Sequence, residues 1–539
     1  MQLSEQYLIN TKKVFHRAGN IFAAARLDKF EQAFIAHNRK TWDRFTPRKD
    51  QGEILLEFNS MSSSIIAFSY MANVLSNRHG AVMKAYLNGR NVIKEKILRY
   101  KFRKIFKSFN VEAFLYYQLS QAQLEEVENL YDSVLLNLKT KKDVEDLKIE
   151  DLWIGDLLYD SHCLRYMTPT VEISDHRFHN SLKDAVGSYV FWRDYFKTRP
   201  VKAVIVSHTV YAQLGVITRL AIKQGVPVYQ VNATHIYFVD KKNLWAYNDF
   251  FYYPERFRKF SIAEQKEGMA IARKKIQQRF SGKVGVDMHY STKSAYGGIR
   301  NNRIIRETER IKILVATHCF FDSPHPYGVN LFPDFYEWLY FLGAVSKKTD
   351  YDWYIKTHPD FLPGNIPIIK EFIDKYPKFT LIPADTSHLQ LIEEGINYGL
   401  TVYGTIGFEY AALGVPVITA SLCNPHIRYR FNTHPRTISE YENILMNLHL
   451  HKLEIDINEV YEYYYMAFID HTNNWLFSDY EGFLKEIGGY AKQFESISYN
   501  VFRRDFSQER HQQIIGSLEK FVDSGEYRFR NQIYPQSNS

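Results

Sequence analysis

Residues 397–421, NYGLTVYGTIGFEYAALGVPVITAS, hold the side chains with the clearest chemical potential in this chain. Gly404 and Gly407 leave room for close approach of a ligand to the backbone, and the Thr405 hydroxyl can cap a helix that begins there. The unbonded N–H groups at a helix start attract an anion such as a phosphate. Glu409, in the first turn or so of that helix, can accept hydrogen bonds from a ribose diol. This combination predicts a binding site for a nucleotide that carries a sugar.

The elements that position these side chains follow from the same segment. Residues 400–403 form a short apolar run typical of a strand, residues 408–413 favour a helix, and Gly414 ends that helix. Residues 415–419 then predict a buried strand. In the alternative interpretation, Gly404 and Gly414 only mark the turns of a β-α-β unit.

The run YGTIGFEYAALGVPVI resembles the donor-site signature of bacterial glycosyltransferases of GT-B architecture, and it is most similar to their capsule and surface-polysaccharide group. That family has a small hydroxyl residue, a glycine and a glutamate at the start of the helix, and Thr405, Gly407 and Glu409 match these positions. The run KTHP, which holds Lys356 and His358, resembles the K-x-HP element of the same enzymes. The two motifs together are more specific than either one alone.

Lys356 and His358 also have an interpretation that does not depend on the resemblance. They stand at the end of a predicted strand, residues 353–356, and basic side chains at such an edge can neutralise a phosphate leaving group. The alternative is a solvated lysine and a histidine held by its neighbours.

The resemblance implies a fold and a reaction. The implied fold is α/β, with two Rossmann-like, doubly wound parallel-sheet domains that face a cleft. The nucleotide is then held mainly by the second domain and the acceptor by the first. The implied reaction transfers a sugar from a nucleotide sugar to a growing surface polysaccharide (capsule or lipopolysaccharide) or to a lipid-linked glycan. No bound cofactor or metal is expected, and CMP-, UDP- and GDP-linked donors all stay open.

Two aspartates and a histidine are the candidate catalytic groups. Asp156 and Asp160 in WIGDLLYDSHCLRY share one face if the segment is helical, and paired carboxylates can supply a general base. The segment resembles a GDL-x-YD-x-x-x-R element of the same family, with one residue too many before Arg165. An ion pair between Asp160 and Arg165 is the alternative. His208 ends a predicted strand, where it is a general base, a phosphate contact or a structural residue.

Further basic side chains lie in two loops. His318 and His325 flank an aspartate in THCFFDSPHPYG, and we favour phosphate or hydroxyl contacts there over a metal site. Residues 424–436, NPHIRYRFNTHPR, follow the last predicted strand, and this density of basic residues suits a phosphate or an acidic sugar. His426 and Arg428 are the candidate contacts. The alternative for this loop is a surface segment with arginine–carboxylate pairs.

The 539 residues exceed what one hydrophobic core of about 250–300 residues accommodates. Alternating strand and helix patterns predict a helical N-terminal extension over 1–50, an acceptor domain over 51–300 and a donor domain over 301–440. A C-terminal helical region over 441–539 is expected to pack back on the first domain. Within the first domain, residues 111–138 are expected to be helical throughout.

Charge and cysteine usage exclude several classes of protein. The net charge of +8 is mild for this length, and no nucleic-acid-binding signature is present. Three widely spaced cysteines suit a reducing compartment. No signal peptide and no apolar run of about 20 residues stands out, so a cytoplasmic protein is expected.

Residues 91–109 carry seven Lys or Arg and one Glu among interleaved apolar residues. Such a basic amphipathic helix can lie on the cytoplasmic face of the inner membrane, and the alternative is a solvated helix with one buried face. Two other functions stay open for the whole chain. One is a sugar-nucleotide epimerase of the same architecture, and the other is a non-catalytic scaffold of a polysaccharide assembly complex.

Overall fold

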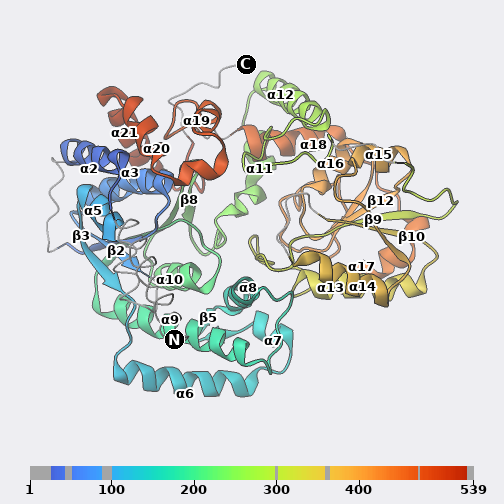
Figure 1. The fold of residues 1–539 in the computed structure, drawn as a ribbon, viewed down its shortest axis with the longest axis horizontal. Helices are drawn as coiled ribbons and strands as arrows, with labels where there is room; N and C mark the ends of the chain where they lie inside the picture. Colours follow the sequence, from blue (N-terminus) through green and yellow to red (C-terminus); the bar gives the residue numbers. More distant parts are fainter. Residues whose placement is uncertain are drawn as a thin grey trace, which may run out of the picture.

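The computed structural model describes residues 26–42, 51–87, 100–297, 302–357, 364–470 and 474–530. His358 lies outside these residues, as do 91–99 of the expected basic helix. The rest of that helix is α5 (Tyr100–Ser108). Figure 1 shows an elongated molecule with one β-sheet towards each end.

The first sheet has six strands in the order β3-β2-β1-β6-β7-β8. Its strands are β1 (Glu53–Glu57), β2 (Val82–Leu87), β3 (Val111–Tyr116), β6 (Val201–Val206), β7 (Val228–Val231) and β8 (Ile236–Val239). All neighbours are parallel except β7 and β8, which are antiparallel. This order is the Rossmann order, in which the chain reverses direction across the sheet between β1 and β6.

The prediction that residues 111–138 are helical throughout is wrong for its first part. Residues 111–116 form β3, which pairs in parallel with β2 at the sheet edge. The helix α6 (Gln121–Asn137) starts only after Ser120, whose hydroxyl accepts the Gln123 amide in a capping box. Pairing with a strand distant in sequence therefore decides the structure of this short apolar run.

Helices cover both faces of the first sheet. On one face lie α2 (Lys29–Thr41), α3 (Ser62–His79) and α5, together with the C-terminal helices α19 (Tyr480–Ile487), α20 (Ile497–Arg504) and α21 (Gln508–Ser524). On the other face lie α6, α8 (Gly155–Tyr166), α9 (His176–Thr198) and α10 (Ala212–Lys223). The last helices of the chain thus complete the core of the first domain.

The second sheet has five parallel strands in the order β11-β10-β9-β12-β13. Its strands are β9 (Lys312–Ala316), β10 (Asp352–Lys356), β11 (Phe379–Leu381), β12 (Tyr398–Thr401) and β13 (Val417–Thr419). The helices around it are α13 (Phe335–Lys348), α14 (Asn365–Lys375), α15 (His388–Glu393), α16 (Ile406–Ala412) and α17 (Ile438–Met446). The chain reverses direction across this sheet between β9 and β12.

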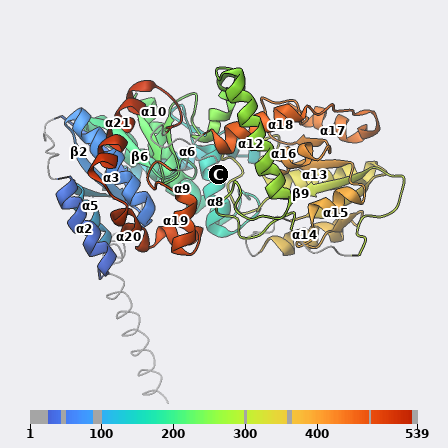
Figure 2. The ribbon, with the colours of Figure 1, turned by 90° about the horizontal axis from the view of Figure 1, so that it is seen from above.

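A third group of helices lies between the two sheets. It comprises α11 (Tyr253–Phe257), α12 (Ile262–Phe280) and α18 (Ile457–Tyr464), which share one aromatic core with α16. Figure 2 shows α12 and α18 alongside each other between the ends of the molecule. The expected fold class is confirmed: two doubly wound parallel-sheet domains with further helices, in the GT-B arrangement. No helix in the described ranges is both long and apolar enough to cross a membrane.

Candidate active site

The ligand crevice of a doubly wound sheet lies at the carboxyl ends of the two strands between which the order reverses. In the first sheet these strands are β1 and β6, and His208 stands two residues after β6. In the second sheet they are β9 and β12, followed by His318 and by Gly404. The Tyr211 hydroxyl donates to Asp322 Oδ1 at 3.0 Å and so joins the loop after β6 to the loop after β9. The two crevices therefore belong to one candidate site.

Thr405 stands at the start of α16, where the sequence predicts a capping threonine. Its backbone is already helical (φ −60°, ψ −20°), and its side chain makes no capping bond. Within the described part of the chain the Thr405 hydroxyl has no hydrogen-bond partner. The expected cap is thus absent, because a capping side chain needs an extended backbone at this position. The hydroxyl is left half-exposed for a ligand.

His318 lies next to this turn. Its ring stacks on Phe335 with the centroids 4.5 Å apart, and its Nε2 lies 3.1 Å from the Thr401 hydroxyl. The Tyr403 amide also donates to Nε2 at 3.4 Å. Gly404 stands so close that a Cβ there would lie 3.6 Å from the imidazole. The structure thus brings together three of the predicted residues, His318, Gly404 and Thr405.

Lys356 ends β10 at the same edge of the second sheet. It is 2 % exposed, and its ammonium donates to the Ala384 carbonyl at 2.7 Å. Burial lowers the pKa of Lys356 to about 8, although Asp385 nearby opposes this change. The lysine therefore supplies a partly desolvated positive charge beside the crevice rather than a solvated one.

Glu409 and Gly407 face the interior. Glu409 is buried, and its carboxylate accepts from the Arg279 guanidinium and, at 2.8 Å, from the Tyr296 hydroxyl. Both partners come from α12 and the loop after it, so this carboxylate joins α16 to α12. A Cβ at Gly407 would lie 2.5 Å from His426 Nδ1, so the glycine is required for packing.

His426 and Arg428 are engaged within the protein. His426 is buried beneath α16, and burial lowers its pKa to about 3. Arg428 donates to the Phe251 carbonyl at 2.6 Å and to Glu255 at 2.6 Å. The alternative interpretation of this loop, with arginine–carboxylate pairs, therefore describes Arg428.

His208 offers one nitrogen to a ligand. Its Nδ1 accepts the amides of Thr209 and Val210 at 3.0 and 3.2 Å, so the ring proton is on Nε2. Burial lowers the pKa of His208 to about 4, with Asp322 opposing, and the ring is neutral at neutral pH. His208 is therefore a hydrogen-bond donor towards the crevice, and its Nε2 has no hydrogen-bond partner among the described residues.

Asp156 and Asp160 lie on α8 at the expected spacing, but each meets a different cation. Asp156 binds Arg219 of α10 through both carboxylate oxygens, at 2.5 Å each. Asp160 lies 2.6 Å from His325 Nδ1 and accepts from the Ser323 hydroxyl. The expected alternative, a pair between Asp160 and Arg165, is absent, because Arg165 binds Asp184 instead.

His325 is fully buried between the domains, where Glu145 lies 3.2 Å from its Nε2. Burial disfavours its cation, but Asp160 and Glu145 outweigh that effect and raise the pKa of His325 to about 10. We call Glu145, Asp160, Ser323 and His325 the interdomain cluster. Lys142 lies 2.9 Å from Glu145 and adds a second positive charge, so both carboxylates are compensated. The cluster therefore holds the domains together, as do the bonds from Tyr159 and Thr170 to Asp334.

Two residues of the crevice were not selected from the sequence. Asp322 is exposed, and its Oδ1 accepts from the Tyr211 hydroxyl and, at 2.8 Å, from the Ser323 amide. Tyr211 has a positive φ of 65°, which is unusual for a residue with a Cβ. Asp322 appeared in the sequence only as part of a doubtful metal pattern. Among the described residues, no group of three His, Cys, Asp or Glu side chains is placed to hold a metal ion.

Comparison with known proteins gives structural neighbours only. No family model and no curated protein matches the chain. One solved structure it resembles is a KpsC β-Kdo 2,4-transferase from Thermosulfurimonas dismutans, at 12 % identity over 49 % of this chain and 79 % of that chain, with a TM-score of 0.31. Another is a UDP-GlcNAc 2-epimerase from Neisseria meningitidis, at 11 % identity over 76 % and 97 %, with a TM-score of 0.19. The function proposed below therefore rests on the residues of this chain.

Proposed function

We propose that this chain is a glycosyltransferase that moves a sugar from a nucleotide sugar to a growing surface polysaccharide or a lipid-linked glycan. The observation that carries this proposal is the hydrogen bond from Tyr211 to Asp322, which brings the strand ends of the two doubly wound sheets together. A transferase must hold a donor and an acceptor on two surfaces and bring them together away from bulk water. Two sheet edges with different polar groups, joined in this way, suit that requirement.

The second domain binds the donor in this proposal. The Thr405 hydroxyl contacts the diphosphate, and Lys356 adds positive charge beside it. Electrostatic stabilisation of the departing phosphate then comes from groups that are already in place. His358 and Glu409 remain in the proposed donor site because of the resemblance. Glu409 faces the interior from α16, where its carboxylate binds Arg279.

Among the catalytic candidates, we assign His208 to substrate contact and the two aspartates of α8 to the protein framework. The neutral His208 donates from Nε2 to the donor phosphate or to an acceptor hydroxyl. Asp322 is the carboxylate we assign to accept a proton, since it is exposed, and Tyr211 and the Ser323 amide both bind its Oδ1, which leaves Oδ2 without a hydrogen-bond partner among the described residues. In the transfer, the acceptor oxygen bonds to the anomeric carbon, the bond to phosphate breaks, and Asp322 takes the hydroxyl proton.

The first experiment is thermal shift with UDP, CMP, GDP and dTDP on the wild type and Thr405→Val. We expect one nucleotide to stabilise the wild type and the variant to lose most of that shift. Thr198→Val, at the far end of α9, is the matched control. If no nucleotide stabilises the folded protein, the proposal is overturned and the scaffold alternative takes its place.

The second experiment is turnover of the matching sugar nucleotide with and without an acceptor glycan. We expect product only with acceptor, and a fall of about 100-fold or more in kcat for Asp322→Asn. Asp374→Asn, on the exposed side of α14, is the matched control. Conversion of the sugar without acceptor would instead identify an epimerase.

Peripheral membrane contact through α5 forms part of the same proposal. Ile105 and Phe106 are buried, whereas Lys104 and Lys107 are exposed, so the contact is electrostatic. We expect co-sedimentation with vesicles that contain anionic lipid, and its loss in Lys104→Glu/Lys107→Glu. Equal sedimentation of wild type and variant would remove membrane contact from the proposal.

A further inference from the structure

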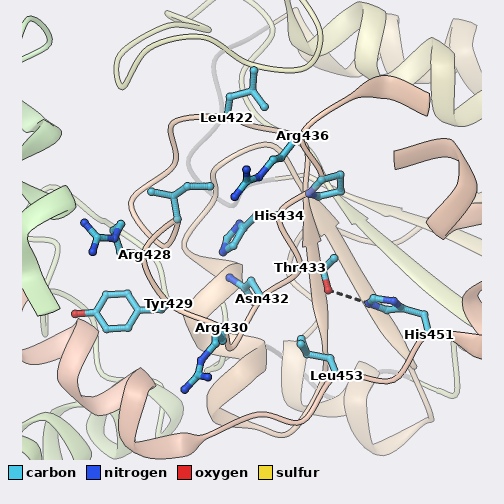
Figure 3. A pocket seen from close by; sticks show the side chains of 12 residues that line it. Leu422, Arg428, Tyr429, Arg430, Asn432, Thr433, His434, Arg436, His451 and Leu453 are labelled. Atoms are coloured by element: carbon cyan, nitrogen blue, oxygen red, sulfur yellow. Dashed lines mark hydrogen bonds between the residues drawn. The ribbon is translucent and has the colours of Figure 1, made fainter. Parts of the chain in front are cut away.

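A cavity of about 730 Å³ lies beside β13, at the outer edge of the second sheet. Its wall is the loop over residues 427–436, and it is completed by Leu422, His451 and Leu453. We call it the basic cavity. Figure 3 shows the arginines of this loop around the opening and the His434 ring between them. The loop runs along the free side of β13 through the Ile418–Thr433 bridge, and its Asn432 packs against Gly407 of α16.

The charge of the basic cavity has one sign. Arg428, Arg430 and Arg436 line it together with two histidines, and no lining residue carries a carboxylate. Glu255 and Glu459 bind Arg428 and Arg430 from outside the lining. Each of these guanidinium groups still has N–H groups that its carboxylate does not use, since a guanidinium has five.

Arg436 is the uncompensated charge. Its backbone amide donates to Glu440 at 2.8 Å, but no carboxylate in the described chain lies within ion-pair distance of its guanidinium. The side chain is exposed at the rim of the cavity. A free guanidinium in this position suits a planar anionic group, which it can bind through two N–H groups at once.

His434 lies at the inner wall of the cavity. Its Nδ1 lies 2.9 Å from the Thr419 hydroxyl and 3.3 Å from the side-chain amide nitrogen of Asn424. Burial lowers the pKa of His434 to about 4, although hydrogen bonds to the backbone of Tyr429 and His426 oppose this change, and the ring stays neutral. The positive charge of the basic cavity therefore comes from its arginines.

Size and lining define the ligand class. A volume of about 730 Å³ falls among pockets that hold drug-sized ligands and exceeds the needs of a lone phosphate. Leu422 and Leu453 supply apolar surface that can pack on the face of a sugar ring. We propose that the basic cavity binds a segment of an anionic glycan, whose carboxylate or phosphate groups meet Arg436. This inference rests on the proposed function, which makes a glycan the acceptor.

The test is calorimetric titration of the full chain with three probes, namely a galacturonic acid tetramer, inorganic phosphate and maltotetraose. We expect the acidic tetramer to bind, with an affinity that falls as salt rises, and the neutral maltotetraose not to bind. Arg436→Gln weakens binding of the tetramer by about five- to tenfold. Arg39→Gln, an exposed arginine of α2, is the matched control and leaves binding unchanged.

The outcomes distinguish a carboxylate ligand from a phosphate ligand. They also distinguish failure of the glycan-binding proposal from failure of the proposed function. Tighter binding of phosphate than of the tetramer, with the same Arg436 dependence, identifies phosphorylated glycan as the ligand. Equal binding of the tetramer to wild type and Arg436→Gln overturns the inference. Arg436 is not one of the proposed donor-site residues, so we expect the nucleotide shift of Arg436→Gln to stay that of the wild type, and failure here leaves the donor site standing. Loss of the nucleotide shift in the wild type overturns the proposed function instead.

Discussion

The interdomain cluster and the basic cavity both collect charged side chains, yet they use them in opposite ways. In the interdomain cluster, His325 is 0 % exposed and meets a carboxylate on each ring nitrogen. In the basic cavity, the Arg430 side chain is 89 % exposed and Arg436 has no carboxylate partner within the described chain. Buried charges must be paired within the protein, whereas exposed ones are free to meet a ligand. Burial therefore separates the paired charges of the interdomain cluster from the candidate binding charges of the basic cavity.

The largest loss of stability is expected when the buried cation is removed. His325→Gln leaves Asp160 buried without a positive partner, although Glu145 keeps Lys142 at 2.9 Å, and breaking a buried pair in this way costs about 3–5 kcal/mol. We expect the melting temperature to fall by about 3–5 °C in a thermal-unfolding scan. An unchanged melting temperature would contradict the structural role of the cluster.

The contribution of the interdomain cluster to stability is expected to depend on pH. The folded-state pKa of His325 is about 10, above its ordinary value of 6.5, so its contribution to stability is complete below about pH 6.5. It declines as the pH rises towards 10, because the ring then loses its proton. We expect the difference in melting temperature between wild type and His325→Gln to shrink between pH 6.5 and 10. A difference that grows over this range would refute the assignment of a protonated His325.

A smaller effect is expected at the inner wall of the loop over 424–436. Gly407→Ala places a Cβ 2.5 Å from His426 Nδ1, and such overpacking costs about 1–3 kcal/mol. Gly516→Ala in α21 is the matched control, because no atom lies within 4 Å of its new Cβ. Urea unfolding should show Gly407→Ala destabilised and the control unchanged or slightly more stable. Equal urea-unfolding midpoints for Gly407→Ala and Gly516→Ala would mean that His426 moves aside at no cost in stability.

The smallest effect on stability is expected in the basic cavity. Arg430→Gln removes an exposed ion pair with Glu459, and such pairs contribute about 0–1 kcal/mol. We expect a change of less than about 2 °C in melting temperature. A large loss of stability would mean that Arg430 serves the framework rather than a ligand.

Most of the fold follows from local patterns in the sequence. The strands expected at residues 353–356, 400–403 and 415–419 and the helix expected at 408–413 lie near the observed β10, β12, β13 and α16, because buried parallel strands are short apolar runs with clear boundaries. Residues 111–116 were misassigned since their apolar side chains continue into a helical pattern. Only pairing with β2 shows them to be a strand.

The candidate site was predicted in part. His208, His318 and Thr405 each stand at a predicted strand end or helix start, so the sequence selects them as edge residues. The sequence also selected Asp160 and His325, but it did not show that they bind each other across the domains at 2.6 Å. Asp322 and Tyr211 carried no signal of their own, because their importance comes from a contact between residues that are far apart in the chain.

Local patterns in the amino-acid sequence are enough to place the βα units and the polar residues at their ends, including Thr405 before α16. These depend on local propensity and on hydrophobic periods of a few residues. The packing of distant segments sets which strands neighbour each other, and hence which polar strand ends come together. It also decided which charges are buried and paired, because the partner of a buried charge is set by packing between segments distant in sequence.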